Sequence, residues 1–350
     1  MSGTDRKIVG IDYLRAIFSV AVVAVHLGYV FPSAIFDEQA YTTHAFGWSD
    51  FVNFYVLCLA VPVFILISTY LYSLKPTDTG ALLRRLGRIV RLLVFWSLAY
   101  QIFFFTGYGF LKQTPRDPEG LAVFLLTAGN TVYYFFIALA VVTVVTHYAK
   151  RWPSGVVWGL FVITTVLVGV LPVAHRALGP EDQTTAVRFL DLHANPLNFL
   201  PLAFAGVGLA RLTRAEANAT LGRLALGAVV LAGASAVLDW TYYVDPLFFT
   251  VNQFAIPAYT RPSLIFLAVA VLTLAIRWRG GGNRVIGFMA RHSLAVYCLH
   301  PFFVPVKYKM KDVLHLTGVA EVVLPLVVVL ALSYAASLVL PWFLRDEVIR

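Results

Sequence analysis

Long apolar segments separated by short polar loops run along the whole chain. This pattern predicts ten membrane spans, since a helix needs about 20 apolar residues to cross a bilayer. The expected ranges are residues 8–31, 51–74, 88–110, 121–148, 155–173, 195–211, 222–240, 255–277, 286–306 and 319–344. We therefore predict an all-α fold, a polytopic membrane helix bundle of about ten transmembrane helices, because helices satisfy their own backbone polar groups in lipid.

The composition favours the same fold class. Hydrophobic residues make up 59% of the 350 residues and charged residues 13%, whereas soluble domains are about 45–50% apolar and 25% charged. No polar stretch is long enough for a separate soluble domain, so we expect a single integral membrane domain over residues 1–350. The two cysteines, Cys58 and Cys298, lie in apolar segments and indicate neither a disulfide framework nor a metal site.

The charge distribution predicts how the chain lies in the membrane. Ten spans place both termini on one side, and the loops on that side contain most of the Lys and Arg residues. By the positive-inside rule both termini are cytoplasmic, in a multi-pass protein of the cell membrane. The net charge of +9 is therefore explained by orientation, with the lipid bilayer as the expected partner and no nucleic acid.

The first span carries ionisable residues that are costly in a membrane. Arg15 and His26 are eleven residues apart, so on a helix they share one face and lie about 16 Å apart along the axis. Asp12 is an i, i+3 partner that can neutralise Arg15. An ionisable group at mid-depth costs about 2.5–3.5 kcal/mol and marks a cavity or a functional site. Purely structural pairing with neighbouring helices is the alternative.

Two further segments carry polar patterns. Arg84, Arg85 and Arg88 form a basic cluster where the third span begins, and guanidinium groups bind phosphates in bidentate fashion. A multiply anionic ligand such as coenzyme A suits this cluster, and anchoring to lipid headgroups is the equally open alternative. In the ninth span, Ser293, Tyr297 and His300 recur at i, i+4 and i+7 and make one polar helix face.

Together these segments resemble the membrane acyltransferase-3 family. The family has a D-x-L-R type start followed by a His eleven residues after the basic residue, an R-x-x-R pair at the start of helix three, and a late S-x-x-x-Y-x-x-H-P segment. The matching positions here are Asp12, Leu14, Arg15 and His26, then Arg85 and Arg88, then Ser293, Tyr297, His300 and Pro301. The likeness therefore extends from the first span to the ninth.

The sequence also departs from the family pattern. Arg91 stands where the family usually has Pro, and Tyr134-Phe135 looks like a drifted form of its W-F-x-x-x-L segment. Many sugar-O-acetylating members carry a Glu in an S-L-x-x-E segment, which this chain lacks. Asp239 and Glu321 are the candidate substitutes for that acid.

The resemblance implies an acyl-CoA-dependent O-acyltransferase. Such an enzyme moves an acyl group, with acetyl as the leading candidate, from cytoplasmic acyl-CoA to a hydroxyl group. Acetyl-CoA is then the co-substrate, and the acceptor is an extracytoplasmic glycan, a glycolipid or a small molecule. No metal is expected. The expected roles are general base for His26, donor steering or oxyanion stabilisation for Arg15 and orientation of Arg15 for Asp12. Direct transfer and a covalent acyl-histidine both stay open.

The remaining residues have binding or supporting roles in this hypothesis. Arg84, Arg85 and Arg88 hold the phosphates of coenzyme A, while Ser293, Tyr297 and His300 line the cavity or tie the ninth span to the first. A glycan or lipid-linked sugar transporter is the main alternative, although no internal repeat of the transporter kind is evident. A non-catalytic scaffold or sensor is the third alternative. Binding of coenzyme A separates the first class from the other two.

Overall fold

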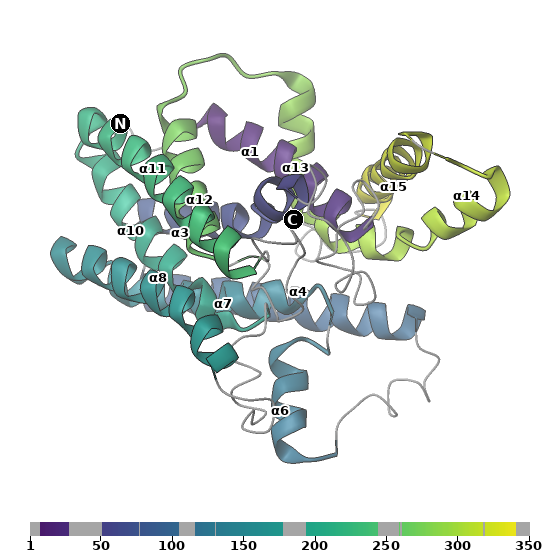
Figure 1. Cartoon of the computed structure of the whole chain (residues 1–350), viewed down its shortest axis with the longest axis horizontal. Coiled ribbons are helices and arrows are strands. Elements are labelled where there is room, and N and C mark those ends of the chain that lie inside the picture. The colour runs from purple at the N-terminus through teal and green to yellow at the C-terminus, as the bar shows by residue number, and fades with distance from the viewer. Residues whose placement is uncertain are drawn as a thin grey trace.

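The computed structural model describes residues 8–27, 51–76, 78–104, 116–129, 131–177, 194–243, 259, 261–317 and 319–340, without the side chains of 171–177 and 240–243. In these ranges the chain forms twelve α-helices and no β-strand (Figure 1). The predicted all-α fold is confirmed. The number of membrane spans and the side on which the termini lie stay predictions.

The helices follow one another closely. Their bounds are α1 Val9–Leu27, η2 Val52–Leu57, α3 Ala60–Leu74, α4 Thr79–Phe104, α6 Pro118–Leu126, α7 Tyr134–Ala149, α8 Ser154–Ala177, η4 Pro196–Phe199, α10 Leu200–Arg214, α11 Asn218–Tyr243, α12 Pro262–Arg277, α13 Arg284–Phe303, α14 Val306–Leu314 and α15 Val319–Val339. Element η2 is a π-helix and η4 a 3-10 helix. Side-chain caps start several of them: Asn283 accepts a hydrogen bond from Val285 N at α13, and Asp117 from Gly120 N at α6.

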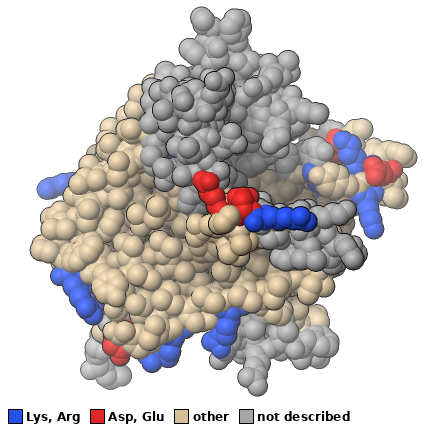
Figure 2. All heavy atoms as spheres, turned by 90° about the horizontal axis from the view of Figure 1, so that it is seen from below, with Lys and Arg blue, Asp and Glu red and all other residues tan. Residues whose placement is uncertain are grey.

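Within the described ranges, five segments are long and apolar enough to cross a membrane: α1, η2 with α3, α4, α11 and α15. The outer surface fits such a setting. On α4, apolar side chains repeat every four residues and are 49–78% exposed: Val90, Val94, Leu98 and Ile102. Exposure of such an apolar stripe to water would be unfavourable. On the face drawn in Figure 2, uncharged residues cover most of the described surface.

Several expected spans differ from the helices observed. Helix α4 begins at Thr79 rather than at 88, so the basic cluster lies on the helix itself. The expected span 121–148 is divided between α6 and α7, because the chain turns at Ala128 and Gly129, which both have positive φ. The ninth span ends at Phe303, and α14 is a separate short helix after it.

Helix α1 lies at the centre of the bundle. Gly10 makes its approach to α12 close: a Cβ at this position would lie 2.1 Å from the carbonyl oxygen of Ala275. The same end of α1 lies beside the start of α13, since Gly282 is next to Val9. The opposite end of α1 meets the C-terminal part of α13 at His300. Helices α1 and α13 are therefore parallel, and α12 is antiparallel to α1.

The bundle has two chemically different ends. At the basic end, α1, α4, α8, α11 and α13 begin and α3, α7, α10 and α12 finish. Contacts between these helix ends place them together: Lys150 Nζ to Lys75 O (2.6 Å), Arg211 Nη1 to Ser154 Oγ (3.0 Å), and Gly222 beside Arg277. Its cations include Arg84, Arg85, Arg88, Lys150, Arg211, Arg214, Arg277 and Arg284. The histidine end is the opposite one, where α1 and α13 finish at His26 and His300.

Candidate active site

Arg15 and His26 lie on one uninterrupted helix, as their spacing predicts. Both residues are half-buried on α1. Arg15 is less than two turns from the start of α1 at the basic end, and the charge of Asp12 acts on its guanidinium group. His26 is in the last turn of α1, at the histidine end. The helix therefore places a cation and an imidazole on one face at two different depths.

The imidazole of His26 faces a second imidazole. The ring centroids of His26 and His300 are 4.8 Å apart, with 53° between the ring planes. His300 is fully buried, whereas His26 is half-buried. The structure thus brings together two residues that the sequence analysis placed in separate motifs.

Hydrogen bonding fixes the tautomer of both rings. Nδ1 of His26 is 2.8 Å from the carbonyl oxygen of Val22, and Nδ1 of His300 is 3.2 Å from that of Val296. A backbone carbonyl only accepts, so each neutral ring donates its Nδ1–H and keeps a lone pair on Nε2. Nε2 of His300 is buried and has no hydrogen-bond partner. Two imidazoles therefore present basic nitrogens in one place.

Tyr297 and Ser293 have structural contacts on α13. The hydroxyl of Tyr297 donates to the carbonyl of Val132, and its ring lies 4.9 Å from Phe135 and 5.9 Å from His300. Ser293 Oγ donates to Ala290 O within the same helix, at 2.9 Å. Tyr297 thus joins α13 to the segment before α7 and lies next to the histidine pair. The hydroxyl of Ser293, in contrast, is hydrogen-bonded within its own helix.

The basic cluster on α4 divides into inward and outward residues. Arg85 is half-buried and donates from Nη2 to Ser68 Oγ (2.6 Å) and from Nε to Thr143 Oγ1 (3.3 Å). Its guanidinium lies 4.6 Å from the ring centre of Tyr72. Arg84 and Arg88 are exposed. Of the three predicted phosphate ligands, Arg85 alone is built into the packed interior.

Other cations lie around the same tyrosine at the basic end. Lys150 Nζ is 5.3 Å from the Tyr72 ring centre, and the Tyr72 hydroxyl is 3.0 Å from His147 Nδ1. Arg214 donates to the last carbonyls of α3, at 3.0 Å from Ser73 O. Burial, and then the neighbouring Arg214, lower the pKa of the Lys150 amine. This end of the bundle concentrates positive charge against an aromatic ring.

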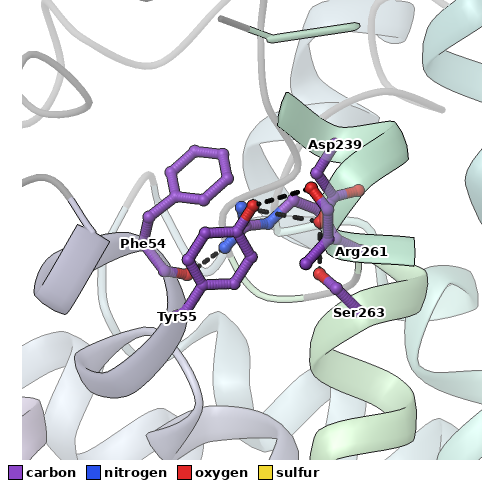
Figure 3. A network of polar contacts seen from close by, with 6 residues as sticks. Phe54, Tyr55, Asp239, Arg261 and Ser263 are labelled. Carbon is purple, nitrogen blue, oxygen red and sulfur yellow. Dashed lines mark hydrogen bonds and ion pairs between the residues drawn. The ribbon is translucent and has the colours of Figure 1, made fainter. Parts of the chain in front are cut away.

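The two candidate substitutes for the missing Glu are engaged elsewhere. Asp239 is buried, accepts a hydrogen bond from Ser263 and lies 3.9 Å from Arg261 Nη1. Figure 3 shows this network, in which Arg261 also donates to the Phe54 carbonyl and stacks on the Phe54 ring at 3.3 Å. Glu321 pairs with Lys311 at 2.8 Å on the surface. Neither acid is paired with His26: the partner of Asp239 is Arg261, the partner of Glu321 is Lys311, and the ring beside His26 is that of His300.

Sequence reasoning missed one buried amine near the histidine end. Lys307, on α14, is 5% exposed and donates to the carbonyl of Leu27, the residue after His26. Burial is the largest cause that lowers its pKa, to about 8, and Lys311 adds to it. The one available signal was its position seven residues after His300, just beyond the expected ninth span at residues 286–306.

The described part of the chain contains no group of three or more His, Cys, Asp or Glu side chains placed to hold a metal ion.

Comparison with known proteins identifies a family. Neither the curated proteins nor the solved structures give a significant match. A family model described as an acyltransferase domain matches residues 8–345, nearly the whole chain. This match covers both the helix of His26 and the helix of His300. With its apolar helices and this match, the chain is a membrane protein that belongs to the acyltransferase 3 family.

Proposed function

We propose that the protein transfers an acyl group from acyl-CoA to a hydroxyl of an acceptor, with His26 as the general base. Acetyl-CoA is the leading candidate for the donor. The observation that carries this proposal is the histidine pair. Both rings have Nδ1 on a backbone carbonyl, which leaves Nε2 of His26 as a lone-pair acceptor. A neutral imidazole with a pKa near 6.5 is well matched to proton removal at neutral pH.

The reaction balances with these groups. His26 Nε2 takes the proton of the acceptor hydroxyl while the oxygen attacks the thioester carbonyl and a carbon–oxygen bond forms. The carbon–sulfur bond then breaks, and the coenzyme A thiolate leaves with the proton from the imidazolium. Arg15, about 16 Å from His26 along the helix, steers the donor toward the base. His300 has a supporting role beside His26, with 4.8 Å between the two ring centroids.

The two ends of the bundle suit two different substrates. The basic end offers Arg85, with Arg84 and Arg88 beside it, to the phosphates of coenzyme A. Arg15 and His26 span about 16 Å along α1, a distance that the pantetheine arm covers. We place the basic end and both termini on the cytoplasmic side of the cell membrane. The acceptor, a glycan, glycolipid or small-molecule alcohol, then reaches His26 from the outside.

The test is release of free thiol from acetyl-CoA by the purified protein in nanodiscs. His26→Ala should abolish release, because a general base contributes about 10²–10⁴-fold. His315→Asn is the matched control, since His315 is an exposed histidine with left-handed backbone that Asn tolerates. Full turnover by His26→Ala would show that His26 is not the base. If the wild type neither turns over nor binds coenzyme A, the acyl-CoA donor is wrong and the transporter alternative gains.

A further inference from the structure

The last turn of α1 has a carbonyl group that needs a donor. The final four carbonyls of any α-helix have no partner within the helix. Leu27 ends α1 and its side chain is 1% exposed, packed with Val23, Val296 and Val329 in a small apolar cluster. In such surroundings an unpaired carbonyl carries the full free-energy cost of its lost hydration. The hydrogen bond from Lys307 removes this cost.

Helix α14 is placed so that it delivers this amine. Figure 1 shows α14 with α15 at one side of the bundle, away from α8. Lys307 is the one residue of α14 that is buried, and its amine also lies 4.7 Å from the Tyr308 ring centre. Lys309, two residues further on, is exposed. The helix therefore directs a single amine inward, onto the carbonyl next to His26.

We propose that Lys307 is a positioning residue for His26, holding the last turn of α1 and keeping the imidazole in its neutral, basic form. The proposal rests on the proposed function, because it assigns His26 as the base. The negative end of the helix dipole favours a protonated His in the last turn. A positive charge fixed on the Leu27 carbonyl opposes this effect.

The charged groups around Lys307 agree with a fixed cation. On its own helix Lys311 repels it, and from α15 Glu321 attracts it, but Lys311 and Glu321 pair with each other at 2.8 Å. On α1, His26 precedes Leu27, whose carbonyl accepts from Lys307, and His300 of α13 lies beside His26. The pKa of Lys307, lowered to about 8, still leaves the amine charged at neutral pH. Its positive charge is lost only under mildly alkaline conditions.

The experiment compares Lys307→Met and Lys307→Arg with Lys309→Met, the matched control on the same helix. One readout is hydrogen–deuterium exchange of residues 20–27, which needs no activity. The other is the pH profile of thiol release. Lys307→Met should speed exchange in the last turn of α1, lower kcat about fivefold to tenfold with an unchanged KM for acetyl-CoA, and move the acidic limb of the profile to higher pH. Lys307→Arg should restore the profile, and Lys309→Met should change neither readout.

Each outcome decides the matter. Unchanged exchange in Lys307→Met overturns the capping role, and an unchanged acidic limb overturns the electrostatic role. A wild-type protein that neither releases thiol nor binds coenzyme A contradicts the proposed function, while the hydrogen–deuterium exchange comparison still tests whether Lys307 caps α1. Above pH 8 the wild-type profile should converge on that of Lys307→Met, because the amine has then lost its charge. Divergence there would count against the proposal.

Discussion

His26 and His300 face each other across the interface of α1 and α13, with ring centroids 4.8 Å apart. Each ring binds the carbonyl four residues earlier in its own helix through Nδ1. Two lone-pair nitrogens are thereby held close together in an apolar setting. Protonation of one imidazole raises the cost of protonating the other, so the pair takes up one proton at a time. Such a pair should behave as one unit in catalysis.

The first prediction is that His300→Phe lowers turnover but does not destabilise the fold. Nε2 of His300 is buried without a partner, which costs about 1–3 kcal/mol, and a phenyl ring fills a similar volume without that atom. We expect an equal or higher melting temperature together with slower thiol release. The double variant His26→Ala/His300→Phe should be no slower than His26→Ala, as a double-mutant cycle on kcat will show. Losses that simply multiply would mean that the two imidazoles act independently.

The second prediction separates the arginines of α4. Arg85→Gln should weaken binding of coenzyme A about tenfold to a hundredfold, since hydrogen bonds to charged groups contribute about 1.5–3 kcal/mol. Arg84→Gln, the exposed neighbour, should change the affinity much less, because exposed ion pairs contribute about 0–1 kcal/mol. Titration calorimetry with coenzyme A measures both. If both variants lost the same amount of affinity for coenzyme A, the arginine cluster as a whole would bind the ligand, and Arg85 would have no special role.

The sequence predicted the all-α fold, and it predicted spacings within one helix better than contacts between helices. The spacing of Arg15 and His26 is a property of one helix, so it could be read from the chain and holds in the structure. The contact between His26 and His300 depends on how α1 and α13 pack, which local periodicity does not specify. The same limit explains why the role of Lys307 was not predicted, because its short helix lies outside the spans expected from the sequence.

The basic cluster shows a second limit of sequence reasoning. Arg84 and Arg85 are adjacent in the chain but about 100° apart around the helix. Only the packing of α3 and α7 decides that Arg85 is the residue that meets Ser68 and Thr143. The end of α6 was missed for a local reason, since the positive φ of Ala128 is unusual for that residue type.

The third prediction concerns the buried pair of Arg261 and Asp239. Arg261 is 0% and Asp239 4% exposed, so removing one partner leaves an uncompensated buried charge. Arg261→Met or Asp239→Leu alone should destabilise the protein by about 3–5 kcal/mol, and the double variant by less than either single change. Thermal unfolding in detergent measures this. Single variants as stable as the wild type would mean that water already solvates the pair.

The last prediction is the pH dependence of stability that Lys307 causes. Its pKa in the folded protein is about 8, against 10.5 ordinarily, with burial as the largest cause. Between these values the unfolded chain holds a proton that the folded chain has released, so the free energy of unfolding rises with pH. Below about pH 8 both states are protonated and the contribution is constant. The wild type should therefore gain stability from pH 8 to 10 relative to Lys307→Met, in chemical unfolding of the nanodisc or detergent-solubilised protein.

The control for this prediction is again Lys309→Met, which removes an exposed amine from the same helix and should leave the slope as in the wild type. The same titration that stabilises the fold removes the ammonium group from the end of α1. The acidic limb of the turnover profile lies where His26 becomes neutral, so above pH 8 the turnover of the wild type and of Lys307→Met should agree while their stabilities diverge. A difference in turnover that persists above pH 8 would contradict the assignment of Lys307 to His26, because the imidazole is then neutral in both proteins.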